Sequence, residues 1–202
     1  MSKYTLVKKD AFKKMQFGAG ILCTQFNPED GTVQDEHIIG ATTGGFKFDA
    51  KPSYKDDGED IDNAPDNAME FKSIENVEVV MSGTLVTVDT ASAKLLIGAA
   101  DVLGNKVTPR NYLKPDDFAT IWWVGDYSDD TTNENGGFVA IKMDNVLTND
   151  GFSIQTGKKE KGNFPFSLMA HYSIANIDKV PYELYIKAGG ALPAAANVKK
   201  GN

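Results

Sequence analysis

The alternation of apolar and polar residues along this chain predicts β-strands over most of its length. In residues 164–172, successive side chains fall on opposite faces of an extended segment, with a period of two. Residues 180–187 repeat the alternation, and Pro181 is tolerated at a strand's first residue because its missing N–H falls outside the ladder. We therefore predict two consecutive strands here. One face of the first consists of Phe164, Phe166, Leu168, Ala170 and Tyr172.

Further strand patterns occur upstream, and glycines interrupt several of them. Gly18 and Gly20 in the first pattern indicate a bulge or a close neighbour. In the longest pattern, the apolar residues change parity after Gly83, which indicates a bulge or a bend. The predicted strands cover residues 17–26, 38–54, 71–88, 118–124, 138–146 and 152–156.

A single helix is predicted at about residues 90–101. Asp89 or Thr90 can cap its start, apolar residues recur at helical spacing, and Gly104 provides a stop. The order of elements indicates a mainly β protein. The expected fold is an antiparallel β-sandwich or partly closed barrel, with one flanking α-helix and a long acidic loop.

The long loop, at about residues 51–69, lies inside the most acidic part of the chain. Residues 49–70 contain eight acidic residues and two lysines, a local charge of −6. A connection this long is usually functional or disordered, and an acidic block is usually a solvated surface. Loose cation binding by its carboxylates stays open as an alternative. We assign residues 1–187 to one domain and residues 188–202 to a flexible tail.

Composition restricts the classes of function. The chain has 202 residues, of which 41% are hydrophobic and 24% charged, as in ordinary globular proteins. One cysteine, Cys23, excludes a disulfide framework and is expected to be a small buried apolar residue. Neither a signal segment nor a membrane-spanning run is visible. The net charge of −7 argues against tight binding to a phosphate backbone.

Catalytic and metal-binding patterns are weak. Two histidines and one cysteine offer little for metal or nucleophilic chemistry, and His171 is expected to be a hydrogen-bonded structural residue. Residues 131–136 resemble the start of a calcium loop, but Lys142 stands where that loop needs a glutamate. We predict no enzymatic activity, no cofactor and no metal site.

Two stretches of sequence resemble a known family. Residues 71–89 (Phe-Lys-Ser-Ile-Glu-Asn-Val-Glu-Val-Val-Met-Ser-Gly-Thr-Leu-Val-Thr-Val-Asp) with the following helix resemble the middle of the major tail tube proteins of siphophages. The segment Phe-Pro-Phe…His-Tyr…Val-Pro-Tyr-Glu, from residue 164 to 183, resembles their C-terminal end. Together the two cover roughly residues 70–187.

The resemblance implies a β-sandwich subunit that forms hexameric rings, which stack into a tube around a channel for DNA. The partners implied are further copies of the chain, tape measure, tail terminator and initiator or baseplate proteins, with transient passage of double-stranded DNA and no membrane. The implied location is the virion, after synthesis in the bacterial cytoplasm.

The resemblance also implies roles for particular residues. The loop at 51–69 occupies the place of one that reaches the neighbouring ring, and acidic strand residues are expected to line the channel and repel DNA phosphates. Trp122 and Trp123 are expected either to anchor an interface or to fill the core. The candidates for ring contacts are Asp56, Asp57, Glu59, Asp60 and Asp62, and those for the channel are Glu75, Glu78 and Asp144.

Three alternatives remain at this point. The first is a tube subunit of a contractile tail or a type VI secretion-like system, which shares the same architecture. The second is a monomeric β-sandwich module that binds carbohydrate or another ligand, with Trp122 and Trp123 as its platform. The third and weakest is an acid–base hydrolase, which needs paired carboxylates in a cleft.

Overall fold

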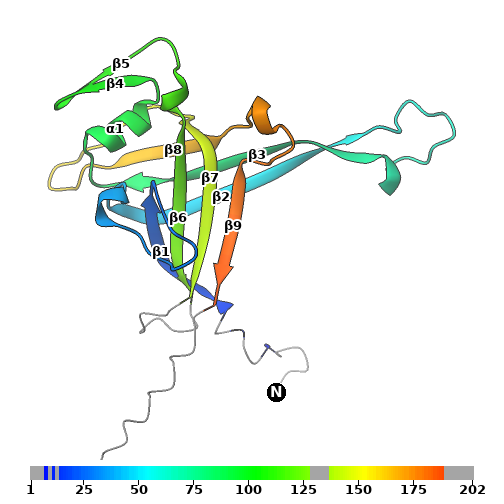
Figure 1. The fold of residues 1–202 in the computed structure, drawn as a ribbon, viewed down its shortest axis with the longest axis horizontal. Helices are drawn as coiled ribbons and strands as arrows, with labels where there is room; N and C mark the ends of the chain where they lie inside the picture. Colours follow the sequence, from blue (N-terminus) through cyan, green and yellow to red (C-terminus); the bar gives the residue numbers. More distant parts are fainter. Residues whose placement is uncertain (1–6, 9–10, 12–13, 128–136, 189–202) are drawn as a thin grey trace, which may run out of the picture.

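Long antiparallel strands dominate the computed structural model, which describes residues 7–8, 11, 14–127 and 137–188 (Figure 1). One α-helix, α1 (Thr90–Ile97), and short 3-10 turns accompany them. The strands are β1 (Gln16–Cys23), β2 (Thr42–Asp56), β3 (Lys72–Leu85), β4 (Ala100–Leu103), β5 (Lys106–Pro109), β6 (Ala119–Tyr127), β7 (Phe138–Thr148), β8 (Phe164–Ala170) and β9 (Tyr182–Lys187).

Seven of these strands form one sheet in the order β1-β6-β7-β8-β3-β2, with β9 paired to β7. In Figure 1, the strands β2, β3 and β8 run across β1, β6, β7 and β9, so that the sheet makes two crossing layers. β7 belongs to both, because its first half lies between β6 and β9 and its last residues, Val146 to Thr148, pair with β8. The sheet is not closed. The predicted class, mainly antiparallel β with one flanking helix, is confirmed.

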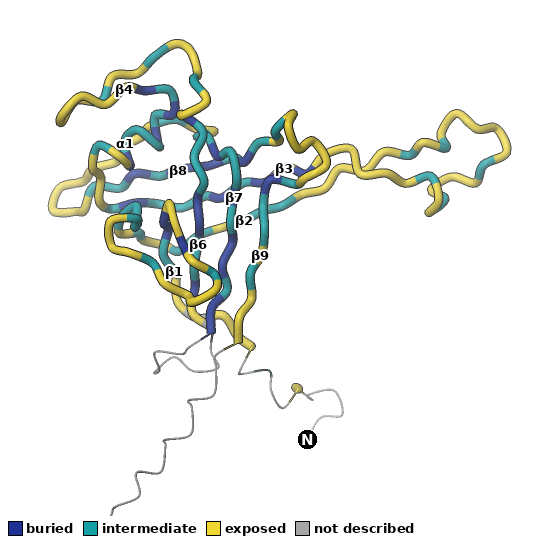
Figure 2. Tube along the Cα trace, in the orientation of Figure 1, coloured by how far each residue is buried: buried dark blue, intermediate teal, exposed yellow. Residues whose placement is uncertain are grey.

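The main core lies between the crossing layers, and the dark segments in Figure 2 follow it. Four residues of the face predicted for β8 are buried, namely Phe164, Phe166, Leu168 and Ala170. The fifth, Tyr172, lies beyond the end of the strand and is 37% exposed, and Ser167, predicted for the opposite face, is buried. A second cluster lies on the other face of β6 and β7, beneath the segment that follows β1. Its buried members are Cys23, Phe26, Trp122, Phe138 and Ala140.

The helix begins as predicted but ends earlier. The Asp89 carboxylate accepts a hydrogen bond from the Ser92 N–H (2.7 Å), and the Ser92 hydroxyl in turn accepts one from the Asp89 N–H (2.9 Å). The predicted end near residue 101 is wrong, because Gly98, at φ +82°, turns the chain out of the helix. Residues 100–109 instead form the β4–β5 hairpin, with Gly104 in its turn.

Two strand predictions also need correction. Residues 152–156 form no strand, since only one isolated bridge, Gln155 to Asn163, joins this segment to another. The irregularity expected near Gly83 lies across from it, where Gly44 and Gly45 of β2 adopt positive φ, while β3 pairs without a break to β8. β3 itself keeps its odd-numbered side chains buried as far as Leu85, and the apolar residues of the other parity, Val86 and Val88, lie beyond its end, so the predicted change of parity inside the strand is wrong.

No helix within the described ranges is long and apolar enough to cross a membrane.

Candidate assembly interface

The most prominent surface feature is a hairpin arm made from the outer halves of β2 and β3. β8 pairs with β3 only between Val79 and Leu85, whereas β2 continues along β3 as far as Asp56 and Lys72. We call residues 51–78 the arm. It projects from the body at the right of Figure 1, and Figure 2 shows it mostly exposed. The predicted loop at 51–69 is therefore partly strand, since β2 extends to Asp56.

Local contacts organise the end of the arm. The Asp56 carboxylate pairs with Lys72 (3.0 Å) and accepts a hydrogen bond from the Gly58 N–H (3.0 Å). Asp57 pairs with Lys55 (2.7 Å) and accepts a hydrogen bond from the Ser73 hydroxyl (2.9 Å). These contacts, led by those of the lysines, lower the pKa of both carboxyls. Of the five acidic candidates for ring contacts, Asp56 and Asp57 therefore make contacts within the arm and stabilise its structure.

The other three acidic candidates face solvent beyond this point. Glu59, Asp60 and Asp62 are exposed in the turn that joins the two strands. No hydrogen bond or ion pair occupies their carboxylates within the described part of the chain. These three are consequently free to meet another molecule.

Apolar side chains accompany the acidic ones along the arm. Met69 is 80% exposed and Ile74 is 64% exposed, and Tyr54 and Ile61 are also exposed. Tyr54 and Ile74 are paired across the two strands, so their exposed side chains are neighbours on one face of the hairpin, and grouped apolar side chains are typical of sites of interaction.

The three channel candidates do not lie together. Glu78 is exposed on β3, opposite Lys51 of β2, and Glu75 is the extra residue where the pairing of β2 and β3 shifts. Asp144 lies on β7, where its carboxylate pairs with Lys142 (3.0 Å) and Lys179 (3.3 Å). Its negative charge is thus offset locally, whereas Glu75 and Glu78 stand on the arm.

The two tryptophans differ in their surroundings. Trp122 is 6% exposed and packs against Phe26 and Tyr185 in the second cluster. Trp123 is half-buried, and its indole N–H donates a hydrogen bond to the carbonyl of Ala19 (3.0 Å). Trp122 is therefore a core residue, in line with the second of the two expectations.

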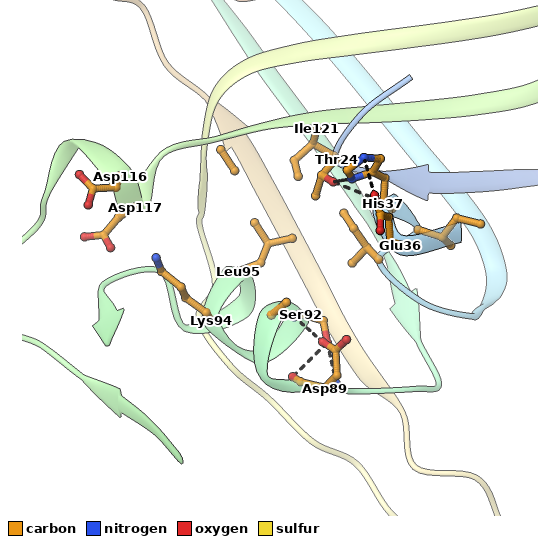
Figure 3. Close-up of a pocket in the computed structure, with 14 residues that line it drawn as sticks. Thr24, Glu36, His37, Asp89, Ser92, Lys94, Leu95, Asp116, Asp117 and Ile121 are labelled. Atoms are coloured by element: carbon orange, nitrogen blue, oxygen red, sulfur yellow. Dashed lines mark hydrogen bonds and ion pairs between the residues drawn. The ribbon is translucent and has the colours of Figure 1, made fainter. Parts of the chain in front are cut away.

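A pocket of about 200 Å³ lies between α1, the segment after β1 and the start of β6 (Figure 3). Its apolar lining includes Ile39, Leu95 and Ile121. Asp89 and Ser92 face it but are engaged in the helix cap. Asp117 also lines it; Lys94 points toward this carboxylate in Figure 3, and Asp117 pairs with Arg110 (2.6 Å).

The structural roles predicted for His171 and Cys23 agree with their surroundings. His171 contacts the backbone oxygen of Asn145 through its ring Nδ1 (3.1 Å) and packs edge-on against Phe118. Cys23 is fully buried, and this burial raises the pKa of its thiol to about 11. No group of three or more metal-binding side chains occurs among the described residues. The calcium-like segment, 131–136, lies outside them.

Comparison with models of known protein families, and with curated proteins, gave no match to this chain. The resemblance to tail tube proteins therefore stays a prediction.

Proposed function

We propose that this protein is a structural subunit of a phage tail tube, which assembles into stacked hexameric rings around a channel for DNA. The observation that carries the proposal is the arm. A two-stranded hairpin without further support is at best marginally stable in water. This one extends beyond the sheet with four exposed apolar side chains, which favours contact with a further subunit.

Unpaired strand edges support the same proposal. Within the described residues, β9 pairs only with β7, and it carries the exposed side chains of Leu184 and Ile186. β2 pairs only with β3 and forms another edge. Open edges invite pairing with a second chain, and head-to-tail contacts close into rings when the rotation allows it. A tube subunit would use such edges within a ring and the arm between rings.

Negative-stain electron microscopy of the full-length protein tests this proposal. Hollow rings or tubes are expected, either from concentrated protein or after addition of the tail initiator proteins of a phage. A variant that lacks residues 56–62 keeps the body and is expected to lose stacking while still forming single rings. Monomers under all these conditions would refute the proposal, and normal tubes from the deletion variant would refute the role of the arm.

The burial of Trp122 weighs against a carbohydrate-binding module. Such a module presents aromatic rings to its ligand, whereas Trp122 lies in the second cluster. The tube subunit of a contractile or secretion-like system shares the features used here, and microscopy of native particles distinguishes it by the presence of a sheath.

A further inference from the structure

We propose that the tip of the arm docks onto the loop before β8, residues 149–163, of a second copy of this chain. The inference rests on the proposed self-assembly and names the surface that receives the arm. We call residues 149–163 the receiving loop. Two complementary properties point to this pair of surfaces, one of charge and one of apolar contact.

The charges of the two surfaces are opposite. Residues 57–70, at the tip of the arm, contain six acidic residues and no basic one. Residues 157–162, in the receiving loop, contain three lysines and one glutamate. Lys158, Lys159 and Lys161 are all exposed, and no ion pair or hydrogen bond occupies their amino groups in the described structure. Opposite charges steer two such surfaces together and set their register.

Apolar side chains stand next to the charges on both surfaces. Ile61 and Met69 are exposed on the arm, and Phe152 and Ile154 are exposed on the receiving loop. Phe152 is held in place by Phe164, the first residue of β8, with ring centroids 6.0 Å apart. Contact between these side chains would remove apolar area from water, a contribution that charge pairs at an exposed surface do not supply.

The two surfaces lie at opposite ends of the same layer of the sheet. Because β3 and β8 are antiparallel, Phe164 at the start of β8 is paired with Leu85 at the end of β3, whereas the arm leaves the sheet beyond Val79. Figure 1 shows the arm at the right and the segment that precedes β8 at the far left. One copy therefore cannot join its own two surfaces. Contact between copies is heterologous and repeats from each copy to the next.

Disulfide trapping tests the contact directly. Asp60→Cys and Lys159→Cys each place one accessible thiol in the full-length chain, and the native Cys23 is buried and does not compete. The two single variants are mixed under mild oxidation and separated on a non-reducing gel. A disulfide-linked dimer that forms in the mixture, and forms much less in either variant alone, is the expected result. Dimers of Asp60→Cys alone in equal yield would indicate tip-to-tip contact and overturn the proposal, as would no dimer at all.

Charge reversal provides an independent test with a matched control. Reversing Glu59, Asp60 and Asp62 to lysine, or reversing Lys158, Lys159 and Lys161 to glutamate, is expected to weaken association about tenfold by sedimentation. Carrying both reversals in one chain restores complementary charges and is expected to restore association. Failure of the double reversal to recover would overturn the pairing.

The outcomes separate this inference from the proposed function. If tubes form normally, the cysteine variants do not cross-link and the charge-reversed variants assemble like wild type, the docking is overturned and the tube function stays intact. Cross-linked chains that never close into rings or tubes would support the docking and refute the tube.

Discussion

The phenol oxygen of Tyr172 accepts a hydrogen bond from the backbone N–H of Val77 (3.1 Å). Regular pairing of β8 with β3 ends at Ala170 and Val79, so this bond continues the support of β3 by two more residues. Val77 is buried while its neighbours further along the arm are exposed. The contact therefore marks the base of the arm and fixes the direction in which it leaves the body.

Replacing Tyr172 with Phe is expected to loosen this base. The variant keeps the ring but leaves the Val77 N–H without its acceptor, at a cost of about 1 kcal/mol. Hydrogen exchange at Val77 and proteolysis of the arm should both become faster, with little change in the core. Tyr54→Phe, at an exposed position of the arm, is the control and should alter neither. Equal exchange at Val77 in wild type and Tyr172→Phe would contradict the assignment.

Replacing Asp89 with Ala is expected to destabilise the protein by about 1 kcal/mol at neutral pH, because the variant loses the N-cap of α1. Hydrogen bonds from Ser92, first from its N–H, lower the pKa of the Asp89 carboxyl in the folded state. A depressed pKa contributes stability above the unfolded value, and that stability is lost as the pH falls through the folded value.

Urea denaturation at several pH values measures this effect. The difference in unfolding free energy between wild type and Asp89→Ala should be constant from neutral pH down to about 5 and should shrink below it. Asp150→Ala, at an exposed turn, serves as the control for the loss of a carboxylate. A difference that grows on acidification would contradict the cap as its source.

How far the sequence predicts the structure depends on how local the determining interaction is. A cap at Asp89 or Thr90 and most of the buried face of β8 depend on neighbouring residues, and the sequence predicts both; the structure places the cap at Asp89. The end of α1 is predicted too late. Leu96 and Ala100 have the spacing of a helix, but Gly98 turns the chain between them. Ala100 is buried as the first residue of β4. An apolar residue at this position therefore fits a helical spacing and a buried strand position equally well.

Pairing between distant segments was also beyond the sequence. β9 follows β8 in the chain but pairs with β7, and nothing in its own alternation distinguishes the two partners. The predicted loop at 51–69 overlaps the predicted strand at 38–54, and β2 extends two residues beyond that strand prediction to Asp56, which pairs with Lys72 across the hairpin. Nothing in the neighbouring sequence predicts a partner for the lysines of the receiving loop, because the surface that we propose for them lies at the far end of the sheet.

Gly20 provides a test of the close approach expected in the first strand. It has φ +71°, and a Cβ there would lie 2.6 Å from both the Trp123 Nε1 and the Val124 carbonyl oxygen. Gly20→Ala should therefore be destabilising through backbone strain and a clash with an adjacent strand. Gly18→Ala is the matched control: Gly18 has φ +73° with open space around it, so this variant introduces the backbone strain without the clash. The melting temperature should fall clearly more for Gly20→Ala than for Gly18→Ala. Equal decreases for the two variants would exclude the clash.

The ion pair of Arg110 and Asp117 yields the last prediction. The side chains are 7% and 1% exposed, and the Asp117 carboxylate also accepts a hydrogen bond from the Lys114 N–H (2.8 Å). Arg110 has a second acidic neighbour, Asp101, at 3.0 Å, but that side chain is 57% exposed. Removing Asp117 takes the buried carboxylate away from Arg110 and leaves it with the exposed Asp101 as its acidic neighbour, a contact that water screens.

Asp117→Asn should therefore lower the urea midpoint more than Asp101→Asn does, although both remove one carboxylate from the same arginine. The Lys114 N–H and then Arg110 lower the pKa of Asp117 in the folded state, so its contribution is present above the unfolded pKa and is lost as the pH falls through the folded one. The difference in urea midpoint between Asp117→Asn and Asp101→Asn should accordingly become smaller at acidic pH. Equal urea midpoints at neutral pH would contradict the prediction, because they would show that the buried carboxylate of Asp117 stabilises the protein no more than the exposed carboxylate of Asp101.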